Sequence, residues 1–256
     1  MRAALKRPAV VIGIALAAVL VLGLVAILIG ALSRPSSLGP SVLGPSALGP
    51  SVRGPSTVSG LVGGVRDGTF ELLDGATSVR VRSGSIGDDL YRVRVPDGGG
   101  LSPRVDRNGG DVRLRLEPAG DGGSGEVEIT LNDRVAWTLR MTGGARQLLI
   151  DMSGATTDEV RLAGGASLIE VALARPGKPV PLTMTGGADQ FRVRVAAGTP
   201  VRVVAGSGAG RVTLGGETHQ GVAGGQTFTA GGWRDGAPGV DVQAQAGAGA
   251  IEVTEG

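Results

Sequence analysis

The sequence predicts an all-β domain preceded by a single transmembrane helix, and two observations lead to this fold class. A short sequence repeat occurs four times between Trp137 and Gly215, as WTLRMTGGARQLLIDM, DEVRLAGGASLIEVAL, VPLTMTGGADQFRVRV and VRVVAGSGAGRVTLGG. In addition, residues 8–33 form an apolar run without a single charge. The repeated alternation of apolar and polar residues is typical of β-strands, and the apolar run is long enough to cross a membrane.

The repeated unit is aligned on the alanine of a Gly-Ala pair. The steps between the four alanines are 21, 22 and 21 residues (Ala145, Ala166, Ala188 and Ala209). Apolar residues recur six and four positions before each alanine, and again three and five positions after it. The residues between these positions are mostly polar or charged, so each unit contains two short strands with one apolar face.

A period of about 21 residues with two strands per unit is too short for a propeller blade or a helical repeat. It is typical of one coil of a β-solenoid, in which equivalent positions stack into columns. We therefore predict a right-handed parallel β-helix with coils of 21–22 residues, in which Leu148, Ile169, Phe191 and Val212 form one inward column. The glycines are expected at corners with positive φ angles. An antiparallel β-sandwich is the alternative.

Two further copies extend the repeat. Gly75-Ala76 has apolar residues at all four expected positions, and a last copy is aligned on Ala250. The 41 residues from Ala209 to Ala250 leave room for one irregular coil, with His219, Phe228 and Trp233. The pattern is poorer before Trp137, where a hairpin is expected from Val105 to Val112. We therefore divide the folded part into an irregular β region at 60–136, which caps the solenoid, and the repeat solenoid at 137–256.

The N-terminal segment predicts a single-pass membrane anchor. About 24 helical residues rise roughly 36 Å, which is enough to cross a hydrocarbon core of about 30 Å. A cleaved signal peptide has a shorter apolar region of about 7–15 residues. The basic residues at 1–7 precede the span, and only Arg34 follows it closely. The positive-inside rule then predicts a cytoplasmic tail at 1–7, a transmembrane helix at 8–33 and an extracytoplasmic C-terminal domain at the cell membrane.

Residues 34–59 form a predicted stalk. Gly-Pro-Ser recurs every five residues, at Gly39, Gly44, Gly49 and Gly54. Proline lacks a backbone donor and glycine weakens regular structure, so a solvated spacer is expected. A glycosylated stalk and a proline-rich docking motif remain alternatives for this segment.

The composition excludes several functional classes. The chain has 256 residues and no cysteine, so disulfides, thiolate metal sites and thiol nucleophiles are absent. The pI near 9.6 is misleading, because five of the 25 basic residues precede residue 60 whereas all 23 acidic residues follow it. The folded part therefore has 20 basic and 23 acidic residues, a formal net charge of −3. With few aromatic residues for stacking as well, a nucleic-acid partner is not expected.

The sequence predicts no catalytic, cofactor-binding or metal-binding residues. His219 is the only histidine, and no Gly-x-Ser-x-Gly motif accompanies it. Asp88 and Asp89 are the most enzyme-like pair, but neighbouring strand residues point to opposite faces. Gly122 to Glu126 resembles a calcium-binding glycine repeat, yet it occurs once and lacks the expected aspartate. No phosphate-binding glycine loop is present.

The outward positions of the repeat suggest how the surface is used. If the coils stack in register, Glu170 lies beside Arg192, and such a pair contributes up to about 1 kcal/mol. A solvated face of mutually compensating charges is the preferred interpretation over a binding stripe. Sugar binding usually requires exposed aromatic side chains, and only Tyr91 and Trp233 are candidates, because Trp137 and Phe191 fall in inward columns.

The Thr/Ala-Gly-Gly-Ala units at 142–145, 163–166 and 185–188 resemble a group of uncharacterised actinobacterial membrane-anchored proteins. Those proteins have a repeated Gly-Gly-Ala β domain after one transmembrane helix. More distantly, residues 60–254 are similar to adhesin-like envelope domains of bacteria and to the C-terminal domains of LiaF-type envelope-stress regulators. The resemblance implies an envelope location and supplies no chemistry that could be assigned to residues of this chain.

Three functional hypotheses follow. The first is a non-catalytic, membrane-anchored β-solenoid with a structural or adhesin-like role, whose partner is a cell-wall polymer. The second is a regulatory or sensor domain that senses envelope stress through a membrane signalling protein. The third, least favoured, is a polysaccharide-acting enzyme that uses Asp88 and Asp89. The ligand and the oligomeric state do not follow from the sequence, although the open ends of a β-helix are edges that must be capped or paired.

Overall fold

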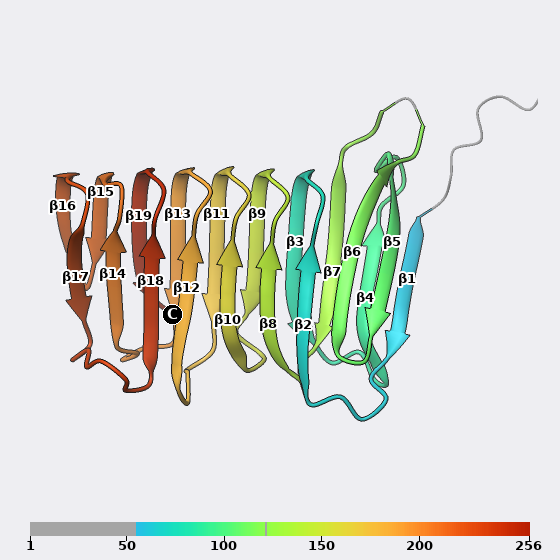
Figure 1. Ribbon diagram of the computed structural model, residues 1–256, viewed down its shortest axis with the longest axis horizontal. Coiled ribbons are helices and arrows are strands. Elements are labelled where there is room, and N and C mark those ends of the chain that lie inside the picture. The colour runs from blue at the N-terminus through green and yellow to red at the C-terminus, as the bar shows by residue number, and fades with distance from the viewer. Residues whose placement is uncertain (1–54, 121) are drawn as a thin grey trace, which may run out of the picture. The chain divides into compact units, whose positions relative to one another are not determined.

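The computed structural model describes residues 55–120 and 122–256. These residues form 19 strands in two mixed sheets and no helix, which confirms the all-β prediction (Figure 1). The predicted tail, the transmembrane helix and most of the predicted stalk lie outside the described residues. Within the part of the chain that the structure describes, no helix is long and apolar enough to span a membrane. The first strand begins at Ser56, inside the range predicted for the stalk.

The two sheets are made of strands that are far apart in the sequence. The ten-stranded sheet, sheet A, has the order β1 (Ser56–Leu61), β4 (Asp89–Val95), β7 (Glu126–Asn132), β3 (Ala76–Gly84), β9 (Ala145–Met152), β11 (Ala166–Leu173), β13 (Ala188–Val195), β19 (Ala248–Glu255), β15 (Ala209–Leu214) and β16 (Glu217–Val222). The nine-stranded sheet, sheet B, has the order β17 (Gln226–Ala230), β14 (Val201–Ala205), β18 (Gly239–Ala244), β12 (Pro179–Met184), β10 (Thr157–Leu162), β8 (Ala136–Met141), β2 (Asp67–Leu72), β6 (Asp111–Pro118) and β5 (Leu101–Asn108).

The centre of both sheets follows the sequence repeat. From β8 to β13 the chain alternates between the sheets, and each strand pairs in parallel with the strand two places later. The predicted register is confirmed here, because Ala145, Ala166 and Ala188 are paired in sequence across sheet A. Ala76 joins the same ladder through β3 and β9, as predicted from the Gly75-Ala76 copy.

The predicted order of the last coils is wrong. Strands β18 and β19, at the red end of the colour scale in Figure 1, lie between β12–β13 and β14–β15. The equivalent alanine is Ala248, which pairs with Ala188 on one side and Ala209 on the other, so the predicted anchor Ala250 is two residues too late. The segment contains two Gly-Ala pairs. In the frame of Ala248, Val242, Ile251 and Val253 take the inward positions of the repeat, and all three are buried.

Antiparallel strands terminate the sheets at both ends. The predicted hairpin from Val105 to Val112 is confirmed as β5 and β6, which form one edge of sheet B. At the other end, β16 pairs antiparallel with β15 and β17 pairs antiparallel with β14. The irregular coil predicted after Ala209 is therefore wrong, because that segment supplies an edge strand to each sheet instead of a turn of the repeat.

One apolar core lies between the sheets. Alternate residues of nearly every strand are buried in a single cluster, whose largest fully buried side chains are Trp137, Phe70 and Phe191. The indole Nε1 of Trp137 donates a hydrogen bond to the backbone oxygen of Asn132 (2.9 Å). The side chain of Asn132 in turn donates to the backbone oxygens of Asp89 (2.6 Å) and Gly87 (3.1 Å). The buried indole nitrogen of Trp137 and the buried side-chain nitrogen of Asn132 are thereby satisfied.

In the three Gly-Gly-Ala corners the glycines are required for a different reason from the one predicted, whereas Gly208 of the fourth copy has the predicted positive φ (91°). Positive φ angles do not occur at Gly143, Gly164 or Gly186, the first glycine of each corner. A Cβ atom on any of these residues would instead overlap the backbone of the preceding coil. The first position therefore needs glycine because the coils approach closely at this edge. The first coil has Asp74 at this position, and its carboxylate accepts a hydrogen bond from the backbone of Leu116 (3.0 Å).

Candidate functional site

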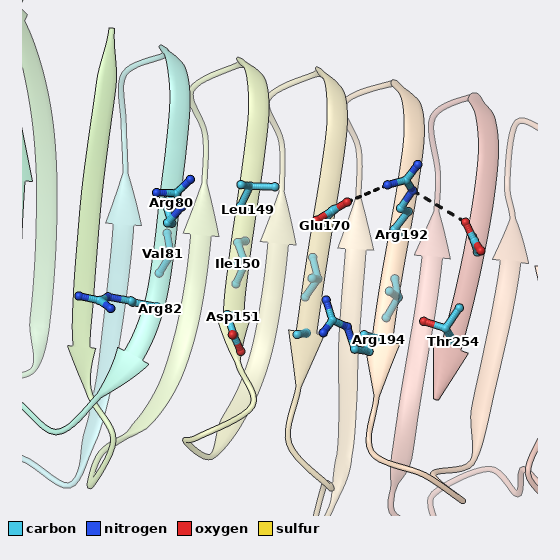
Figure 2. Close-up of a pocket in the computed structure, with 14 residues that line it drawn as sticks. Arg80, Val81, Arg82, Leu149, Ile150, Asp151, Glu170, Arg192, Arg194 and Thr254 are labelled. Atoms are coloured by element: carbon cyan, nitrogen blue, oxygen red, sulfur yellow. Dashed lines mark hydrogen bonds and ion pairs between the residues drawn. The ribbon is translucent and has the colours of Figure 1, made fainter. Parts of the chain in front are cut away.

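A hollow of about 610 Å³ lies on the outer face of sheet A, over strands β3, β9, β11, β13 and β19 (Figure 2). It is an open depression, lined mainly by side chains that point away from the core; the strands also contribute Val81, Ile150, Val171 and Val193, whose side chains are buried. The residues that face outward in it are Arg80, Arg82, Leu149, Asp151, Glu170, Ala172, Arg192, Arg194, Glu252 and Thr254.

The strand register arranges these side chains in two rows across the sheet. The leucine row consists of Arg80, Leu149, Glu170, Arg192 and Glu252. The alanine row consists of Arg82, Asp151, Ala172, Arg194 and Thr254. The two rows occupy the positions four and six residues after the Gly-Ala alanine of each coil, counted from Ala248 in the last coil. Between the charged side chains of the two rows, the floor of the hollow is formed by Ala172 and Leu149, whose side chains are small or apolar.

In the leucine row, opposite charges compensate one another. Arg192 forms ion pairs with Glu170 (2.9 Å) and Glu252 (3.8 Å), and it also donates to the side-chain oxygen of Gln190 (2.6 Å). The predicted contact between Glu170 and Arg192 is confirmed. Because all three charged side chains are 37–48% exposed, each pair contributes only about 0–1 kcal/mol. At the other end, Arg80 lies 3.6 Å from Glu128, which also pairs with Arg94.

The alanine row is different, because its two arginines are not neutralised. Nε of Arg82 donates to the hydroxyl of Thr130 (3.2 Å), which leaves its terminal nitrogens available. Among the described residues, no carboxylate lies within 4.0 Å of the guanidinium nitrogens of Arg82 or Arg194. The one acid of the row, Asp151, accepts hydrogen bonds from the backbone (3.1 Å) and the hydroxyl (2.6 Å) of Ser153 in the following turn.

The carboxylate pair predicted as the most enzyme-like feature lies away from this hollow. Asp89 begins β4 and forms an ion pair with Arg92 (2.7 Å). Asp88 is exposed in the turn before it. Among the described residues, no group of three acidic or histidine side chains is placed to hold a metal ion. Asp89 therefore takes part in an ion pair at the protein surface.

His219 belongs to the edge strand β16, where its ring stacks on Phe228 of β17 with centroids 4.6 Å apart. Its Nε2 lies 3.8 Å from the carboxylate of Glu217. The stack covers the end of the core between the two edge strands. His219 therefore packs against Phe228 at this edge of the fold.

The two aromatic candidates for sugar binding are both engaged within the protein. Tyr91 is buried, and burial, reinforced by the charge of Asp89, raises the pKa of its hydroxyl against the opposing charge of Arg107. Trp233 lies against the guanidinium of Arg202, which is 5.3 Å from the ring centroid. Neither ring lines the hollow on sheet A.

Arg202 is the centre of a second charged cluster, on the outer face of sheet B. It binds both oxygens of Asp241 (2.8 and 2.7 Å) and one oxygen of Asp235 (3.1 Å). Burial raises the pKa of Asp241, but hydrogen bonds from Arg202 and Gln243 and the charge of Arg202 outweigh it, so the pKa lies below its ordinary value. The indole of Trp233 also donates to Asp235 (3.1 Å). These contacts hold the connection from β17 to β18 on the sheet, and this role was not visible in the sequence.

Sequence reasoning found the outward rows but not the hollow. The repeat fixed Glu170, Arg192 and Arg194 in their rows, because their coils are consecutive. Arg80, Arg82 and Glu252 join the rows through the Ala76 copy and the inserted coil. The signal for Glu252 was its place four residues after Ala248, which was lost when the copy was aligned on Ala250.

Comparisons with known proteins identify the fold. No protein-family model matches the chain, and no curated protein matches it. Among solved structures, a "putative cell adhesion protein" from Clostridium sporogenes is similar with a TM-score of 0.53 and 16% identity, over 78% of this chain and 99% of that one. A "putative adhesin" from Bacteroides fragilis matches with a TM-score of 0.29 and 11% identity, over 78% and 97% of the two chains. The first similarity shows a shared all-β fold, and the resemblance to actinobacterial and LiaF-type proteins stays a prediction.

Proposed function

We propose that this chain is a non-catalytic, adhesin-like binding module held outside the cytoplasmic membrane by its N-terminal segment. The observation that carries the proposal is the open hollow on sheet A, which spans five strands and is lined by charged side chains. Ligand pockets for small molecules are usually concave and largely apolar. A shallow charged depression is suited to holding a surface or a long polymer.

The uncharged run at 8–33 and the Gly-Pro-Ser repeats support the location, because together they supply an anchor and a spacer. The fold shared with a protein named for cell adhesion is consistent with this role and does not define a ligand.

The central coils further support a scaffold role. We infer that β8 to β13 form a short right-handed parallel β-helix, since the strands pair in parallel with offsets of 21 and 22 residues. Right-handed connections between parallel strands are found in about 98% of cases. Such a scaffold repeats its outward positions at the strand spacing, which produces the rows of the hollow.

A protease-accessibility experiment on intact spheroplasts tests the location. The full chain carries a C-terminal epitope tag, and external protease is expected to remove the tag while a cytoplasmic control protein survives. Protection of the tag until the membrane is permeabilised would contradict the proposal. The same full chain, purified in neutral detergent, is expected to sediment with isolated cell walls; failure to do so would remove the adhesin-like role.

A further inference from the structure

We propose that the hollow on sheet A binds a linear anionic polysaccharide, and that Arg82 and Arg194 are the residues that recognise its charged groups. This inference rests on the proposed function and names the ligand class for the same face. The charged groups of the polymer are carboxylates or phosphodiesters, because a guanidinium forms paired hydrogen bonds with either.

The first step of the argument is the availability of the two arginines. In the leucine row, Arg192 lies between two carboxylates and also donates to Gln190. In the alanine row, neither Arg82 nor Arg194 has a carboxylate within 4.0 Å among the described residues, and both are exposed. The ion pairs of the leucine row neutralise Arg192. In the alanine row, Arg82 and Arg194 are therefore the two positive groups without an ion pair among the described residues.

The second step is their spacing. Arg82 of β3 and Arg194 of β13 are separated by the strands β9 and β11, so they are three strand spacings apart, about 14 Å. Ala172 and Asp151 lie between them in the same row. A ligand that contacts both arginines must therefore be extended across the strands and carry anionic groups at intervals that match this separation.

The third step is the character of the floor. Leu149 and Ala172 provide a low surface between the arginines, and no aromatic side chain lines the hollow. Neutral sugars and single-stranded nucleic acids are usually held by stacking on aromatic side chains. Recognition on this face depends instead on charge, which favours an acidic polymer. Asp151 and Glu170 would repel a polymer that carries a negative charge on every unit. The ligand is therefore expected to have charged units separated by neutral units.

The experiment measures binding by the full chain in neutral detergent, immobilised through a C-terminal tag. The probes are hyaluronan, whose carboxylates alternate with neutral sugars, for the carboxylate arm, a linear poly(N-acetylmannosamine phosphate) for the phosphodiester arm, dextran as the neutral polymer and a DNA duplex as an unrelated polyanion. The test variant is Arg82→Gln with Arg194→Gln. The matched control is Arg115→Gln with Arg234→Gln, which removes the same charge from exposed arginines outside the hollow. Circular dichroism melting checks that both variants fold.

We expect at least one acidic polymer to bind and dextran not to bind. The test variant should weaken that binding about tenfold to a hundredfold, because two charge-assisted contacts are lost, whereas the control should change it less than about threefold. An equal loss in both variants would show a net-charge effect and overturn the assignment. DNA binding with the same dependence on Arg82 and Arg194 would overturn the polysaccharide class. Failure of both acidic polymers, with retained sedimentation on cell walls, would refute this ligand while leaving the proposed function in place.

Discussion

At the scale of single residues, the corner glycines set how closely the coils stack. A Cβ on Gly164 would overlap the backbone of Gly143, whereas a Cβ on the adjacent Gly165 would lie 3.3 Å from the backbone oxygen of Gly187. Neither glycine has a positive φ, so a change to alanine introduces no backbone strain. The two positions therefore differ mainly in space. The inserted coil has Ala246 at the first position, which shows that some adjustment is available there.

We expect Gly164→Ala to lower the free energy of unfolding by about 1–3 kcal/mol, because it forces two coils apart in the middle of the stack. Gly165→Ala should be neutral within about 1 kcal/mol, since the steric contact is mild and the unfolded chain loses entropy. Urea denaturation of the two variants measures the difference. Equal losses at both positions would show that close stacking at the first glycine is not the constraint.

At the scale of elements, one partly buried ion pair joins Arg202 of β14 to Asp241 of the neighbouring strand β18. The side chain of Asp241 is 13% exposed and Arg202 binds both of its oxygens, whereas Asp235 is 84% exposed and shares the same arginine. Because the pKa of Asp241 in the folded protein lies below its ordinary value, its ionised form stabilises the fold. This contribution is fully present above the unfolded pKa of about 3.9 and is lost as the pH falls through the folded pKa.

We expect Asp241→Asn to lower the free energy of unfolding by about 1–3 kcal/mol near pH 7, because a buried charged hydrogen-bond pair is broken. The difference from the unchanged protein should shrink as the pH falls below about 3.9, where Asp241 of the unfolded chain becomes protonated, and it should be lost as the pH falls through the lower pKa of the folded protein. Asp235→Asn, which removes the exposed partner, is expected to cost less than about 1 kcal/mol. Thermal unfolding from pH 7 to pH 2.5 measures both curves. A loss that is constant across this range would contradict the role of the Asp241 charge.

The strands that could be predicted are those whose neighbours in the sheet are also neighbours in the repeat. Alternation and the step of 21–22 residues gave β8 to β13 and the contact of Glu170 with Arg192, because the same local pattern encodes strand and register. Insertion of β18 and β19 was missed, since local pattern does not specify which edge a later coil joins. After β13 the chain passes through β14 in sheet B and returns to sheet A as β15, with one strand position between it and β13. No local sequence pattern indicates that this position is left open for β19. The hollow depends on that insertion, so only part of its lining could be predicted.

At the scale of the whole described unit, β18 and β19 complete the fold by filling a gap in both sheets. β18 pairs in parallel with β12 and β14, and β19 pairs in parallel with β13 and β15. Val242 and Ile251 are fully buried between their neighbours. Without these two strands, the β14–β17 segment would have no parallel partner on its inner side. The segment is therefore attached to the rest of the core chiefly through the inserted coil.

We expect truncation of the full chain after Pro238 to leave β14–β17 undocked and to expose the inner edges of β12 and β13, so that the melting temperature falls or the protein aggregates. A synthetic peptide of residues 239–256 added in trans should restore the transition in a concentration-dependent way, because it binds only the folded gap. The same peptide with Val242→Asp and Ile251→Asp should not restore it, since charges would enter the core. Thermal melts at increasing peptide concentration measure this effect. A truncated chain that keeps the melting temperature of the complete protein would show that the inserted coil is dispensable.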